Sequence, residues 1–124
     1  MTAFGVAGAA AGGDPSLVGK WRIEVVRGAG AFDASKTAFE VAADGRVSST
    51  VGCNRMVGKP TIAGDRIAFG PMAATRMACP PPLDQLETAY LAALEAARGW
   101  RIDGSKLKLI DERGKTMVTL ERAE

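Results

Sequence analysis

The 124-residue sequence predicts an α+β domain in which one helix covers a curved antiparallel sheet. Most of the chain consists of short stretches in which apolar and polar residues alternate, separated by turns that contain glycine. This is the pattern of antiparallel strands with one buried face and one solvated face. One stretch, residues 83–97, instead repeats apolar residues at steps of three and four, which is the period of an amphipathic helix.

The strands follow the alternation in order along the chain. In the first, residues 20–26, the alternation places Trp21, Ile23 and Val25 on the buried face. The later strands are expected at 37–42, 46–51, 60–62, 66–69, 100–102, 106–110 and 116–121. The turns between them have hairpin chemistry, as in Asp44-Gly45 and Ala63-Gly64-Asp65.

The helix is predicted directly after the proline run Pro80-Pro81-Pro82, because proline is tolerated in a first helical turn. Asp84 and Glu87 are expected in that turn, where the helix dipole favours negative charge. Gly99 is expected to end the helix as a left-handed cap. The apolar stripe that faces the sheet consists of Leu83, Leu86, Tyr90, Leu94 and Ala97.

Two cysteines are the only thiols of the chain, and each lies in a dense local motif. The motifs are Gly52-Cys53-Asn54-Arg55-Met56-Val57-Gly58 and Thr75-Arg76-Met77-Ala78-Cys79-Pro80. Gly52 and Gly58 permit a positive φ or a close backbone approach, and Asn54 favours a turn. The first motif therefore predicts a corner between two strands.

Three interpretations of the cysteines are open. A Cys53–Cys79 disulfide would close a loop of about 26 residues and stabilise the fold by roughly 3–4 kcal/mol. The pair could also be reduced and buried, or Cys79 could be a reactive thiol, since it precedes a helix and Arg76 would favour its thiolate. The disulfide is favoured, because no second cysteine lies near Cys79 in the sequence to resolve a redox intermediate.

The composition argues against several classes of function. The chain has no histidine, so a Ser-His or Cys-His nucleophile and an imidazole metal ligand are excluded. Two cysteines alone do not complete a tetrahedral zinc site. We therefore expect no enzyme, no catalytic residue, no metal and no cofactor. The acidic residues that could pair as acid and base lie mostly at turns or a helix start, and they are Asp65, Asp84, Glu87, Asp103, Asp111 and Glu112.

Nucleic acid and membrane are likewise not expected as partners. The net charge of +2 comes from 16 basic and 14 acidic residues that are scattered along the chain, without a basic stripe that carries aromatics. No apolar run reaches membrane-spanning length. Residues 1–13 are small or apolar and uncharged, and they are expected to be disordered or the remnant of a signal or linker segment, with the domain at 14–124.

The order of motifs resembles the META domain, the family of the bacterial heat-shock protein HslJ. The resemblance spans Leu17 to Arg122 and is most specific in its two cysteine motifs. Its segments are Leu17-Val18-Gly19-Lys20-Trp21, Gly45-Arg46-Val47-Ser48, Gly52 to Gly58, Ile67 to Cys79, Leu86-Glu87 and Leu107-Lys108-Leu109.

The resemblance implies a partly open, antiparallel barrel around a helix, and it supports the disulfide. It implies a periplasmic, outer-envelope-associated or secreted domain that is linked to heat shock and stress. The family brings no established catalytic residues. Its signature in this chain consists of Cys53 and Cys79 with Gly52, Asn54, Gly58, Thr75, Arg76 and Met77.

Two classes of function follow as expectations. The first is a non-enzymatic envelope module that binds another protein, since polar strand faces are expected to expose Arg22, Glu24, Lys106 and Lys108. The second is a carrier of a small apolar or lipid-like ligand between helix and sheet, because the helix is rich in alanine and the chain has few aromatic residues. Small residues, however, more often indicate close packing.

Overall fold

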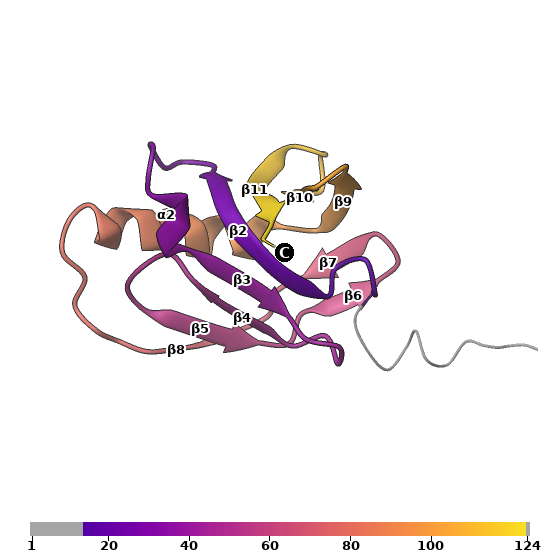
Figure 1. The fold of residues 1–124 in the computed structure, drawn as a ribbon, viewed down its shortest axis with the longest axis horizontal. Coiled ribbons are helices and arrows are strands. Elements are labelled where there is room, and N and C mark those ends of the chain that lie inside the picture. The colour runs from indigo at the N-terminus through magenta and orange to yellow at the C-terminus, as the bar shows by residue number, and fades with distance from the viewer. Residues whose placement is uncertain (1–13, 124) are drawn as a thin grey trace, which may run out of the picture.

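A computed structural model describes residues 14–123, and its ten strands form one antiparallel sheet that curls around one α-helix (Figure 1). The strand order is β6-β7-β9-β10-β11-β2-β3-β4-β5-β8. The elements are β2 (Gly19–Val26), η1 (Ala34–Lys36), β3 (Ala38–Val41), β4 (Val47–Thr50), β5 (Arg55–Gly58), β6 (Thr61–Ala63), β7 (Arg66–Ala68), β8 (Ala73–Ala74), α2 (Leu83–Ala96), β9 (Gly99–Asp103), β10 (Lys106–Ile110) and β11 (Thr116–Arg122). The α+β class and the curved half-barrel that the sequence predicted are confirmed.

The hydrophobic core lies between the curled sheet and the helix, which is drawn in salmon to orange behind β2 in Figure 1. Its largest fully buried side chains are Trp21, Phe39 and Tyr90. Phe39 meets Phe69 edge to face, with ring centroids 6.3 Å apart. Four of the six aromatic residues within 14–123 are therefore buried in the interior, where such side chains bury a large apolar area.

The predicted hairpins form as their turn residues indicate. Ala42 and Arg46 close the turn between β3 and β4, and Gly45 takes a φ of +91° within it. Gly64, between β6 and β7, takes a φ of +59°. Glycine meets this requirement without the steric penalty that other residues carry.

One predicted burial in β2 is wrong. Val25 was expected inside with Trp21 and Ile23, yet its side chain is 56% exposed, and Val26 is buried in its place. The pairing with β11 shifts register here: Thr119 lies opposite Val25, while its neighbour Leu120 lies opposite Ile23. This β-bulge adds one residue to β2, so the alternation changes face after Ile23.

The predicted end of the helix is also wrong. Gly99 does not cap α2 in the left-handed region. Ala97 ends the helix with an extended backbone, φ −65° and ψ 137°, and Gly99 is the first residue of β9. A Cβ at Gly99 would lie 3.2 Å from the Asp65 carbonyl oxygen and 3.2 Å from Ile110, so its role is the close approach of β9 to its neighbours.

Three short elements have no counterpart among the predicted strands, namely η1, β5 and β8. β8 pairs with β5 and forms one edge of the sheet. After β8 the chain sweeps around one end of the molecule before α2 begins (Figure 1). The expectation for residues 1–13 falls outside the described residues. Within residues 14–123, no helix has the length and apolar character required to cross a membrane.

Candidate functional site

The two cysteine motifs meet at the start of the helix. Cys53 lies at the corner between β4 and β5, and Cys79 lies in the segment that leads from β8 to α2. A disulfide joins them, with Cα atoms 6.0 Å apart, and both residues are half-buried. The bond ties the β4–β5 corner, near one edge of the sheet, to the segment that enters the helix.

Asn54 is the hydrogen-bonding centre of this region and is only 5% exposed. Its Oδ1 accepts hydrogen bonds from the Met77 backbone N–H at 2.7 Å and from Thr75 Oγ1 at 2.9 Å. Its Nδ2 donates to the Met77 carbonyl oxygen at 3.2 Å, to Cys79 Sγ at 3.3 Å and to Glu87 Oε2 at 2.8 Å. A single buried side-chain amide therefore fixes the backbone of Met77 and contacts Thr75 and Cys79 on either side of it.

Glu87 is the member of this site whose role the sequence interpretation missed. It was expected in the first helical turn, but Asp84 occupies that turn and Glu87 lies in the next one. From there its Oε1 accepts a hydrogen bond from the Asn54 backbone N–H at 3.0 Å. The pair Leu86-Glu87 was part of the family resemblance, and this was the signal that could have singled it out.

The motif glycines serve the two purposes that were predicted for them. Gly52 has a φ of +122°, and a Cβ there would lie 3.4 Å from Leu83. Gly58 permits a close approach instead, since a Cβ there would lie 2.9 Å from Met72 Cγ and 3.5 Å from its Cα. The corner and the strand that leaves it thus require glycine at these positions.

Arg76 and Met77 differ from the other motif residues, because their side chains point into solvent. Met77 is 58% exposed although both of its backbone polar groups are bonded to Asn54. Arg76 is exposed, and within residues 14–123 its side chain forms no hydrogen bond or ion pair. The structure brings Cys53, Cys79, Asn54, Thr75 and Met77 together and presents Arg76 at the surface beside them.

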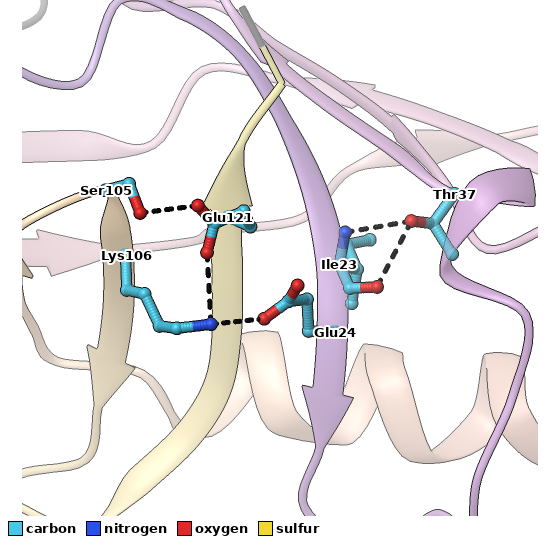
Figure 2. Close-up of polar contacts among 6 residues, drawn as sticks. All are labelled: Ile23, Glu24, Thr37, Ser105, Lys106 and Glu121. Atoms are coloured by element: carbon cyan, nitrogen blue, oxygen red, sulfur yellow. Dashed lines mark hydrogen bonds and ion pairs between the residues drawn. The ribbon is translucent and has the colours of Figure 1, made fainter.

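The polar outer face of the sheet is occupied by contacts within the protein itself. Figure 2 shows Lys106 of β10 between Glu121 of β11 and Glu24 of β2. The ammonium lies 2.7 Å from Glu24 and 3.0 Å from Glu121. Its hydrogen bonds to Glu24 and Glu121 raise the pKa of Lys106. The hydroxyl of Ser105 and then the Lys106 ammonium lower the pKa of Glu121.

Figure 2 also shows how β2 separates from β3. Regular pairing of the two strands ends at Trp21 and Phe39. Beyond it, the Thr37 hydroxyl accepts a hydrogen bond from the Ile23 N–H at 2.8 Å and lies 3.3 Å from the Ile23 carbonyl oxygen. These contacts fasten the end of η1 to β2 where the β2–β3 pairing stops.

Among the acidic residues that were considered as acid–base candidates, Asp65, Asp111 and Glu112 line one surface hollow. Asp84, Asp103 and Asp111 have local partners. Asp84 accepts from the Gln85 N–H at the helix start. Asp103 lies 3.7 Å from Lys108. Asp111 accepts from two backbone N–H groups of its own turn, chiefly that of Lys115, and these bonds lower its pKa.

The fold and this site define a class of protein: a curled antiparallel half-barrel around one helix, with a disulfide that fastens the helix entry to the sheet. The META domain matches residues 15–124. The chain belongs to the META domain family.

Comparison with solved structures agrees on the fold. An NMR structure of a protein from Burkholderia xenovorans is similar with a TM-score of 0.67 at 24% identity, covering 99% of this chain and 92% of that one. A crystal structure of a DUF4847 family protein from Bacteroides vulgatus is similar with a TM-score of 0.61 at 14% identity, covering 85% of this chain and 92% of that one. No curated protein matches the chain.

Proposed function

We propose that this META domain is a non-enzymatic binding module of the bacterial envelope or the secreted fraction, serving under heat or other stress. It docks onto another protein through the segment Thr75–Cys79, which we term the docking loop. The observation that carries this proposal is the contrast within the docking loop. Its backbone is fixed by Asn54 and the disulfide, while Arg76 and Met77 are exposed.

A rigid exposed loop is suited to binding because little conformational entropy remains to be lost on association. Arginine and methionine are enriched at protein interfaces relative to the rest of the surface. The partner surface that fits has a carboxylate for the Arg76 guanidinium beside an apolar pocket for the Met77 thioether. The polar sheet face is less suited, since Lys106 is already paired with Glu24 and Glu121.

The proposal that the domain is not an enzyme rests on the chemistry of its side chains. The chain has no histidine. Asp84, Asp103 and Asp111 are each engaged by a local partner. Glu87 is held by Asn54. The envelope or secreted location is supported by the disulfide, which persists in oxidising compartments.

Cross-linking with matched variants tests the docking loop. The tagged domain is incubated with envelope extract of a bacterium that encodes it, cross-linked and captured. The wild-type chain is expected to capture one recurrent protein, and Arg76→Ala with Met77→Ala is expected to lose it. The control replaces exposed residues elsewhere, Val25→Ala with Arg46→Ala, and should capture as wild type does. Equal capture by both double variants would exclude the docking loop.

The second candidate, a carrier of an apolar ligand, depends on a groove beside the helix. The helix side chains that face the sheet are packed in the core, among them Tyr90 and Leu94. A ligand would therefore lie in the groove of about 590 Å³ between the 69–72 segment and α2, where Leu91 is 39% exposed. Extraction of the purified protein with organic solvent should then yield a lipid-like species, and Leu91→Gln should reduce its amount.

A further inference from the structure

We propose that the reduced form of Cys53 and Cys79, together with Glu87, is a binding site for a zinc-class divalent cation. The two sulfur atoms and a carboxylate oxygen of Glu87 all lie within 4.8 Å of one another. The three residues come from different parts of the chain: the β4–β5 corner, the segment before α2, and α2 itself. The site shares Cys79 with the docking loop, but neither of the exposed side chains proposed to contact the partner, Arg76 and Met77, supplies a ligand.

The spacing suits a tetrahedral ion. Zn–S bonds of about 2.3 Å and Zn–O bonds of about 2.1 Å place the sulfur and oxygen ligands about 3.6 Å apart. Cys79 Sγ and Glu87 Oε1 are already 4.0 Å apart. Once the disulfide is broken, the sulfurs need only separate to about 3.8 Å, which side-chain rotation can supply. All three residues are half-buried, so a water molecule can reach the fourth position.

Asn54 would orient two of the three ligands. Its backbone N–H and Nδ2 bind the two carboxylate oxygens of Glu87 at 3.0 and 2.8 Å. Nδ2 also donates to Cys79 Sγ at 3.3 Å, where it would stabilise the negative charge of a thiolate. Groups that hold metal ligands in this way are commonly required for full affinity.

Formation of the metal site takes two steps, reduction of the disulfide and binding of the cation. A dithiol reductant breaks the S–S bond: two electrons and two protons pass to Cys53 and Cys79, and the dithiol becomes a disulfide. The cation then binds both sulfurs as thiolates, and two protons leave to solvent. Glu87 binds as the carboxylate. Two thiolates and a carboxylate form a donor set that suits Zn²⁺.

Cobalt titration tests the site directly. The full chain is reduced with dithiothreitol, freed of it without oxygen, and titrated with Co²⁺, followed by displacement with Zn²⁺. One Co²⁺ should bind per chain, with a sulfur-to-cobalt charge-transfer band and the intense visible bands of four-coordinate cobalt. The oxidised chain should show neither. Zn²⁺ should also raise the thermal midpoint of the reduced chain and not that of the oxidised chain.

Variants distinguish a site in which Glu87 is a metal ligand from metal binding by the two thiols alone. Glu87→Gln should weaken binding by more than about tenfold. Glu95→Gln, an exposed glutamate on the same helix, should bind as wild type does. Equal affinity of Glu87→Gln and wild type would overturn the proposal. A reduced wild-type chain without the charge-transfer band, and without a thermal shift on Zn²⁺ addition, would overturn it as well.

Discussion

Asn54 and Glu87 are 33 residues apart in the chain and are joined by two hydrogen bonds, one to each carboxylate oxygen. The same Asn54 amide bonds both backbone groups of Met77. The helix, the β4–β5 corner and the docking loop are therefore coupled through one side chain. The Gly-Cys-Asn and Thr-Arg-Met-Ala-Cys motifs therefore form the two sides of one hydrogen-bonded, disulfide-linked site.

Replacement of Asn54 should be strongly destabilising. Asn54→Ala removes the side-chain hydrogen bonds to Glu87 Oε2 and to both backbone polar groups of Met77, while the Asn54 backbone N–H keeps its bond to Glu87 Oε1. Such losses cost about 1–3 kcal/mol each where the group stays buried, and we expect about 2–4 kcal/mol in total. Urea unfolding measures the free energy, with the exposed Gln85→Ala as a near-neutral control. A loss below about 1 kcal/mol would contradict the central role of Asn54.

The disulfide should make a contribution of similar size. In the chain-entropy relation a loop of about 26 residues gives roughly 3–4 kcal/mol. Cys53→Ala with Cys79→Ala is therefore expected to lower the free energy of unfolding by that amount. Alkylation of the unfolded, unreduced chain should add no mass, and alkylation after reduction should add two labels. Two labels without prior reduction would disprove the bond.

The β-bulge in β2 can be tested by placing threonine, in separate variants, at each of two adjacent positions. Val26 is 1% exposed and Val25 is 56% exposed. Val26→Thr buries a hydroxyl and should cost about 1–2 kcal/mol, whereas Val25→Thr should stay within about 0.5 kcal/mol. Chemical unfolding of both variants gives the comparison. A larger loss of stability in Val25→Thr than in Val26→Thr would contradict the bulge and support the simple alternation that the sequence predicted.

These cases show where sequence reasoning succeeds and where it stops. The hairpin at Asp44-Gly45 was predictable because the turn and the alternation are local properties. The exposure of Val25 was not, because the bulge depends on how β11 pairs with β2. The role of Glu87 was missed for a similar reason: its partner Asn54 reaches it only in the folded chain. β8 comprises two residues, too few for a period to be recognised.

Tyr90 and Ser49 form a polar contact inside the core, with hydroxyl oxygens 2.6 Å apart. Ser49 donates to the Ala38 carbonyl oxygen, so Tyr90 is the donor to Ser49. Ser49→Ala leaves the buried Tyr90 hydroxyl unpaired and should cost about 1–3 kcal/mol. Tyr90→Phe removes the donor together with its need for a partner and should cost about 1 kcal/mol. Urea unfolding of the two variants decides the order, and a larger loss in Tyr90→Phe would contradict this assignment.

Tyr90 also predicts the alkaline behaviour of the chain, because it is the only tyrosine. Burial raises its pKa above the ordinary value of 10.0, so the folded state favours the neutral phenol. The resulting stability is present below pH 10 and is lost as pH rises above it. Phenolate absorbance should therefore appear together with unfolding, as monitored by circular dichroism. Titration of Tyr90 near its ordinary value in a folded chain would be inconsistent with its burial.

The decline of the unfolding free energy at low pH should depend on Asp111 and Glu121. Hydrogen bonds to the ionised forms lower the pKa of Asp111 below 3.8 and that of Glu121 below 4.5. A group whose pKa is lower in the folded state stabilises the protein above its unfolded pKa, and that stability is lost as pH falls through the folded value. Asp111→Asn and Glu121→Gln should each flatten the decline of the unfolding free energy below about pH 4.

The measurement is urea unfolding across the acid range, with Glu112→Gln as the control. Glu112 is exposed in the same turn as Asp111, but within residues 14–123 its side chain accepts no hydrogen bond. Its replacement should therefore leave the slope unchanged. Because Asp111 bonds two backbone N–H groups, the flattening should persist at high salt, where the attraction of exposed charges is screened. A slope in Asp111→Asn equal to that of the wild type would mean that these hydrogen bonds do not favour the ionised carboxylate.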